Sequence, residues 1–245
     1  NFGAAANLNY RHRKVNFFIN YGISYRDSPG GGSLLQNRSS GDTTYILRQT
    51  TTNEFQGLTN NVRGGIDYFF SEKSILTGSM LWRRSDARRL TDIRYEDFLF
   101  TYDQPLGYTL RQQDETEDEP NSEYSLVYKR KFGREGHELT AETKYLNYWE
   151  HSDQSFPQRT FDANGAEDVG KALFQKSLND EYENQYLLQV DYVRPIGKDG
   201  KFETGLRSSF RDMVNDYVVT EKNVDGSFST VPGLDNYFIY KENIN

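Results

Sequence analysis

Apolar and polar residues alternate along this chain in segments of about ten residues. In the clearest segment, residues 15–26, every second residue is apolar: Val15, Phe17, Ile19, Tyr21, Ile23 and Tyr25. Successive side chains of a strand point to opposite faces, so these residues share one face and mostly polar residues share the other. Phe18 is the large apolar exception on the polar side. The pattern predicts strands with one apolar and one polar face.

The same alternation predicts strands at 3–11, 15–26, 58–70, 75–86, 122–130, 137–149, 184–194 and 201–212, with a further strand beginning near residue 237. Short connections at 11–14, 71–74, 131–136 and 195–200 alternate with long polar segments at 27–57, 87–121, 150–183 and 213–236. Short periplasmic turns and long extracellular loops are typical of outer-membrane barrels. We therefore predict an all-β, antiparallel, up-and-down transmembrane β-barrel in the cell outer membrane.

With the strand that begins near residue 237, the predicted strands number nine, whereas a complete bacterial barrel has an even number. We expect residues 1–245 to form part of a single, larger barrel domain, with the plug domain and the remaining strands outside this sequence. Open sheet edges are not tolerated in lipid. Residues 1–245 expressed alone are therefore expected to aggregate.

The apolar face gives a set of residues expected to face lipid: Val15, Phe17, Ile19, Tyr21, Ile23, Tyr25, Val62, Ile66, Tyr68, Tyr186, Leu188, Val190, Tyr192, Leu206 and Phe210. The opposite face carries charges that we expect inside the barrel: Arg63, Asp67, Glu142, Lys144, Asp191, Glu203 and Arg207. These charges either pair with each other or with a plug, or line a polar channel, because unpaired charges in a low-dielectric lumen are costly.

Composition removes several classes of function. The chain has no cysteine, so disulfides and thiolate sites are impossible, and its three histidines are scattered, so we expect no metal site and no cofactor. The net charge of −7 argues against nucleic-acid binding. No spacing suggests a nucleophile with a positioned base, so we expect no enzyme. No apolar run approaches the ~20 residues of a spanning helix.

Three polar segments are candidates for chemistry. Arg83, Arg84, Arg88 and Arg89 follow Trp82, where we expect the outer membrane interface; they form either a solvated loop base or a contact for lipopolysaccharide phosphates or another anion. The acidic run 114–119 is expected to be a solvated loop, with a weak divalent-cation site as the alternative. Residues 162–168 and 223–226 have a trace of a calcium-loop rhythm but lack the distal glutamate, and are expected to be plain turns.

The long polar segments also contain apolar patches at 45–47 and 98–102. Either the strands continue beyond the membrane into a raised rim, or these aromatic residues line a binding vestibule.

Two stretches resemble a known family. Residues 185–195 (QYLLQVDYVRP) run into residues 201–211 (KFETGLRSSFR), and together they resemble a hairpin of the outer-membrane barrel of TonB-dependent receptors of the Bacteroidetes type. The closing residues 240–245 (YKENIN) are similar to the start of that family's next strand. The resemblance implies a 22-stranded barrel closed by an N-terminal plug and energised by TonB. It transfers no ligand-contact residues to this chain.

The resulting hypothesis is a receptor barrel that takes up an unidentified nutrient, which could be a small molecule such as an iron chelate, a peptide or a glycan. Its expected partners are outer-membrane lipid and lipopolysaccharide, the TonB system acting through a plug, and a surface lipoprotein lid. One alternative is a passive or adhesive barrel that binds partners through its long loops. The other is a soluble β-sandwich that binds sugars.

Overall fold

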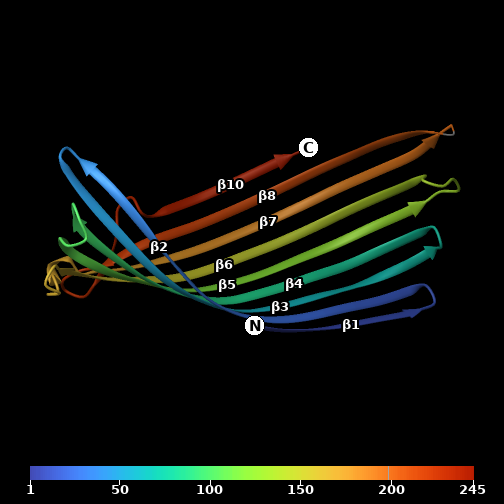
Figure 1. The fold of residues 1–245 in the computed structure, drawn as a ribbon. Helices are drawn as coiled ribbons and strands as arrows, with labels where there is room; N and C mark the ends of the chain where they lie inside the picture. Colours follow the sequence, from blue (N-terminus) through green and yellow to red (C-terminus); the bar gives the residue numbers. More distant parts are fainter. Residues whose placement is uncertain (198) are drawn as a thin grey trace.

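The computed structural model describes residues 1–197 and 199–245, and almost all of them lie in one antiparallel sheet (Figure 1). The strands are β1 (Phe2–His12), β2 (Val15–Ser40), β3 (Thr43–Ser71), β4 (Ser74–Leu99), β5 (Pro105–Lys131), β6 (Glu138–Asp162), β7 (Leu173–Ile196), β8 (Gly200–Lys222), β9 (Phe228–Thr230) and β10 (Asn236–Ile244). A 3-10 turn, η1 (Val169–Lys171), precedes β7. Within the described residues, no helix has the length and apolarity needed to cross a membrane.

Each strand pairs with its neighbour in the chain, in the order β1-β2-β3-β4-β5-β6-β7-β8-β10, and the short β9 adds to β8 outside this path. Figure 1 shows a curved sheet that runs from β1 at one edge to β10 at the other. In the described part of the chain, no pairing joins these two edges, so the sheet is not closed. The predicted all-β, up-and-down architecture is confirmed, including its nine strands in chain order.

The strands are much longer than predicted, so the prediction of long extracellular loops is wrong for most of those segments. The connections on that side shrink to residues 41–42, 100–104, 163–172 and, beyond β8, 223–227 and 231–235. The prediction failed because these extensions carry polar residues on both faces and therefore lack the apolar alternation. The alternative, strands that continue into a raised rim, is confirmed for residues 45–47 on β3 and 98–99 on β4, whereas residues 100–102 lie in the connection between β4 and β5.

The short connections lie where the sequence predicted them, between β1 and β2, β3 and β4, β5 and β6, and β7 and β8. Positive φ angles occur at Arg13 (53°), Gly136 (72°) and Gly197 (59°). Glycine adopts this backbone region without steric cost, which explains its place in two of these turns.

The register places every residue that we expect to face lipid on one face of the sheet. Directly opposite residues of an antiparallel pair point to the same side. One row of such residues crosses the sheet from β1 to β8: Leu8, Ile19, Gly64, Met80, Tyr124, Tyr145, Tyr186 and Phe210. Large apolar side chains on this face are open to the surroundings, with Leu188 55% and Leu206 81% exposed. We call this apolar surface the belt; its contact with lipid stays a prediction.

The belt has the height of a bilayer core. On β3 it extends from Leu58 to Tyr68, a length of about 34 Å at the rise of an antiparallel strand. A strand tilt of about 35–45° reduces this to about 25 Å, the height of the apolar band of outer-membrane barrels. On β4 the belt ends at Trp82, beyond which Arg84 and Asp86 occupy the same face. We call the strand extensions beyond the belt the rim (residues 26–57, 84–119, 150–181 and 214–236).

Phe18, the apolar exception on the polar face, has a local role. It lies opposite Gly65, where an added Cβ would come within 2.4 Å of the Phe18 ring and 2.6 Å of the Gly78 carbonyl oxygen. The ring therefore covers backbone that a side chain cannot cover, a known way of stabilising glycine in a sheet.

Met80 and Ser79 test which face meets lipid, because they are adjacent on β4 and point to opposite sides. We expect Met80→Arg to cost about 2–4 kcal/mol, since a cation near the bilayer midplane is strongly unfavourable. The matched control, Ser79→Arg, should fold because its side chain enters the polar face. The measurement is the yield of heat-modifiable, folded protein in the native outer membrane. Equal yields of the two variants would contradict the assignment of the belt.

Candidate functional site: the polar face of the sheet

The polar face contains a hollow of about 640 Å³ between β1 and β6. Small side chains at Ala5, Gly22 and Ser79 leave the space. Longer polar side chains surround it: Asn7, Asn20, Asn61, Arg63, Glu123 and Lys144. On β2, Asn20 lies between the belt residues Ile19 and Tyr21, so the hollow opens on the side of the sheet opposite to the belt. Amide and charged groups of this kind can bind polar solutes through hydrogen bonds.

The charges expected inside the barrel all lie on this polar face, and several have partners there. The Lys144 ammonium lies 3.2 Å from the Glu142 carboxylate and 4.0 Å from that of Glu123. The Asp67 carboxylate accepts hydrogen bonds from Asn16 (3.0 Å) and Thr77 (2.7 Å). Pairing within the wall is thus confirmed for Glu142 with Lys144.

The remaining members of that set differ in their surroundings. The Asp191 carboxylate accepts a 2.7 Å hydrogen bond from Gln189, and Glu203 pairs with Lys201 at 2.8 Å. Among the described residues, no ion pair is recorded for Arg63 or Arg207. These two guanidinium groups give the polar face positive charge that can still attract a solute or another part of the protein.

The arginine segment lies on β4 rather than at the base of a loop, so that part of the prediction is wrong. Strand alternation splits it: Arg84 and Arg88 share the face of the belt, whereas Arg83 and Arg89 share the polar face. Successive side chains of a strand point to opposite faces, which separates these arginines into two pairs. The prediction of a loop base did not include this separation.

Three of these arginines pair with the acidic run, which is strand β5 and not a solvated loop. Arg84 forms a two-bond pair with Asp118 (3.0 Å), and Arg88 forms one with Asp114 (2.8 and 2.7 Å). On the polar face, Arg89 lies 2.7 Å from Glu115. The sequence prediction treated the basic and acidic runs separately because only the β4–β5 register brings them together. Contact of the arginines with lipopolysaccharide phosphate stays a prediction, and a phosphate would compete with these carboxylates.

A cluster of carboxylates lies on the polar face of the rim. Single oxygens of Glu117, Glu119 and Glu150 lie within 4.8 Å of one another. The hydrogen bond with Glu119, burial and neighbouring carboxylates raise the pKa of Glu117 to about 8. Oxygen ligands of this kind suit hard divalent cations, so these residues could hold one. A weak cation site was the alternative predicted for the acidic run, and it stays a prediction; Glu150, which joins the run from β6, was not part of it.

The two segments with a calcium-loop rhythm are plain turns, as predicted. The Asp162 carboxylate accepts hydrogen bonds from the backbone of Asn164 (2.8 Å) and Ala166 (2.9 Å), and Gly165 has a φ of 82°. The Asp225 carboxylate accepts a similar bond from the backbone of Ser227 (2.9 Å). Both carboxylates thus stabilise their own turns.

The histidines remain far apart along the sheet. His151 Nδ1 lies 2.6 Å from the Asp180 carboxylate on the face of the belt, and His137 Nε2 lies 2.9 Å from the Tyr192 hydroxyl near a turn. His12 ends β1. This arrangement does not bring the three histidines together.

Comparison with known proteins agrees with this architecture. Residues 130–245, from the end of β5 through β10, match the model of a family described as an outer membrane protein beta-barrel family. None of the curated proteins compared matches the chain. The antiparallel sheet, its two unlike faces and the family match define an outer-membrane β-barrel protein, located in the outer membrane.

Glu117 gives a test based on pH. Its carboxyl titrates near 4.5 when unfolded and near 8 when folded, so the folded state loses stability as the pH rises through this window. We expect Glu117→Gln to raise the melting temperature by a few degrees at pH 9 and to change little at pH 4. The measurement is thermal unfolding in detergent, with Glu135→Gln in a turn as the control. A difference that does not depend on pH would contradict the raised pKa.

The Arg88–Asp114 pair should contribute little to stability despite its good geometry. Its side chains are 59% and 31% exposed, and solvent screens ion pairs of this kind. A double-mutant cycle of Arg88→Ala and Asp114→Ala, measured by thermal unfolding, should give a small coupling that falls with added salt. A large coupling that does not change with salt would contradict this expectation.

Proposed function

We propose that this chain is part of a TonB-dependent receptor barrel that takes up a nutrient across the outer membrane. The observation that carries the proposal is the continuous polar face behind the belt, with its 640 Å³ hollow and the charges of Arg63 and Lys144. A wall that is apolar toward lipid and polar toward the lumen suits a passage for hydrophilic solutes.

The open sheet also supports a wide barrel. Eight strands already close into a barrel whose interior side chains fill it, whereas the nine strands paired here in chain order do not close. A barrel with more strands encloses a lumen that needs a plug to prevent leakage, and a plug is the part on which TonB would act. The resemblance of residues 185–195 and 201–211 to TonB-dependent receptors agrees with this proposal.

A passive or adhesive barrel is the second candidate, and the rim favours it. The rim consists of paired strands rather than flexible loops, as in the hairpin of β2 and β3, which extends to Ser40 and Thr43. A rigid, raised surface of this kind could bind a partner without transport. Neither candidate assigns a catalytic step to this chain.

Uptake by cells separates these candidates. Three radiolabelled probes would be supplied to energised cells: a ferric chelate, a mixture of oligopeptides and a mixture of oligosaccharides. We expect one of them to enter in a manner that stops when TonB is deleted. Asn61→Trp, which fills the hollow, should reduce that uptake at least about tenfold, because a bulky side chain in a pocket blocks entry of a solute.

The control for this experiment is Val62→Trp, which lies next to Asn61 on β3 but on the face of the belt. It should leave uptake unchanged. Entry that persists without TonB would support a passive barrel. Absence of uptake for all three probes, together with retained adhesion of cells to a surface, would support the adhesive barrel.

A further inference from the structure

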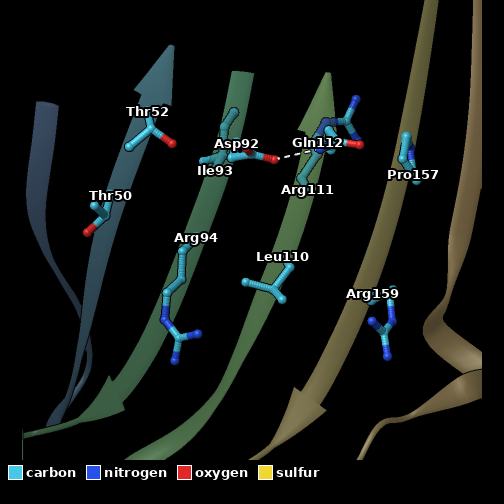
Figure 2. A pocket seen from close by; sticks show the side chains of 10 residues that line it. All are labelled: Thr50, Thr52, Asp92, Ile93, Arg94, Leu110, Arg111, Gln112, Pro157 and Arg159. Carbon is cyan, nitrogen blue, oxygen red and sulfur yellow. Dashed lines mark hydrogen bonds between the residues drawn. The ribbon is translucent and has the colours of Figure 1, made fainter. Parts of the chain in front are cut away.

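A second hollow, of about 460 Å³, lies on the rim and crosses strands β3 to β6 (Figure 2). Arg94 and Asp92 are an even number of residues from the belt residue Met80 on β4, so their side chains lie on the same face of the sheet as Met80. Their partners across the sheet, Leu110 and Gln112, lie on the same side. The hollow therefore opens on the outer side of the barrel, continuous with the belt, and is separate from the polar face that would line the lumen.

The height of the hollow limits what can occupy it. On β3, Thr52 and Thr50 lie about 20 and 27 Å along the strand beyond Leu58, where the belt ends. A tilt of about 35–45° places them about 15–20 Å above the apolar band. The headgroup layer of a bilayer leaflet is only about 5–8 Å thick. Lipid phosphates therefore lie below the hollow, and only the sugars that project from an outer-leaflet glycolipid reach it.

Two guanidinium groups border one end of the hollow, and aromatic rings hold them. The Arg94 guanidinium lies 4.0 Å from the centre of the Tyr108 ring, which stacks on Phe161 at 4.6 Å. The Arg159 guanidinium lies 5.1 Å from the centre of the Phe161 ring. The four side chains form a row of cation, ring, ring and cation. Each contact of this kind reduces the freedom of the arginine side chain, so the cations are positioned before a ligand arrives.

Carboxylates complete the positioning of both arginines. Arg94 Nε lies 3.2 Å from Glu96, and Arg159 forms a two-bond pair with Glu167. Arg94 and Arg159 remain 43% and 58% exposed, so the hollow is accessible from outside. Arginine retains further N–H donors after such pairing, and its planar group suits the oxygens of phosphate and carboxylate.

The rest of the hollow offers groups that recognise sugars. Asp92 accepts a 2.9 Å hydrogen bond from Gln112, and Thr52 lies beside them (Figure 2). Leu110 lies between Arg94 and Arg159 in the register, and Pro157 lies two residues from Arg159 on β6, so both add apolar surface to the hollow. A carboxylate, an amide and hydroxyls can donate to and accept from sugar hydroxyls, while the apolar surface can contact a ring face.

We propose that this hollow binds the phosphorylated core oligosaccharide of neighbouring lipopolysaccharide. Arg94 and Arg159 line it on this face, and each retains N–H donors beside its paired carboxylate that can bind the phosphate of an anionic sugar. Bound glycan on the outside of the rim would anchor the protein laterally among the surrounding lipopolysaccharide. This site is independent of TonB and of transport through the lumen.

Binding of purified lipopolysaccharide to the detergent-solubilised protein tests the proposal. Three probes separate the sources of the ligand: lipopolysaccharide with a phosphorylated core, the same material after removal of core phosphate, and lipid A alone. The wild type should bind the first at least about tenfold more tightly than the other two, since charge-assisted contacts to phosphate are strong. Arg94→Gln with Arg159→Gln should abolish this preference.

Two further variants keep the result interpretable. Leu110→Trp fills the hollow without changing its charge and should also weaken binding, even where the double arginine variant fails to fold. The matched control is Lys176→Gln, a cation on the same face of β7 that does not line the hollow, which should leave the preference unchanged. Equal binding of all three probes, or unchanged binding by Leu110→Trp, would overturn the proposal. The proposal would also be overturned if the double arginine variant lost a surface protein that co-purifies with the wild type while its lipopolysaccharide binding stayed unchanged.

Discussion

The structure depends on one constraint, the absence of water in the bilayer core. Backbone N–H and C=O groups there must bond to one another, and a sheet achieves this only when each strand has a neighbour on both sides. In the continuous ladder from β1 to β8 and β10, strands β2 to β7, each paired on both sides, meet this requirement over the height of the belt, whereas β1 and β10 are the open edges of the sheet. The ladder also imposes the period of two, so a single strand serves lipid with one set of side chains and an aqueous lumen with the other.

Beyond the belt, the same ladder continues under different forces. Water can bond to the rim backbone, so pairing there is no longer compulsory, and polar cross-strand contacts support it. The Arg84–Asp118 and Arg88–Asp114 pairs on β4 and β5 are examples. Each exposed pair contributes little, but opposite charges at diagonal positions of two neighbouring strands favour one register over a slipped one. The rim therefore extends the barrel wall and carries surfaces on both its inner and outer sides.

The sequence predicted the belt well because lipid imposes a strict chemical rule there. Ile19, Tyr186 and Phe210 come from distant segments, yet alternation alone assigned them to one face, on which the register now places them. The strands of the rim were not predicted, because apolar residues do not occupy every second position there. The clusters of Glu117 with Glu150, and of Arg94 with Arg159, were also hidden, since each depends on which strands are neighbours and in which register. The family resemblance gave the class of barrel but no residue of either hollow.

Alternation of access along β3 is the most direct test of this account. The chain has no cysteine, so single cysteines at residues 61–64 and 66 can be labelled without background. A membrane-impermeant maleimide and a lipid-soluble quencher would be applied to the folded protein in membranes. The account predicts that positions 61 and 63 react with the maleimide and that labels at positions 62, 64 and 66 are quenched. Uniform labelling, or the opposite phase, would contradict a belt that faces lipid.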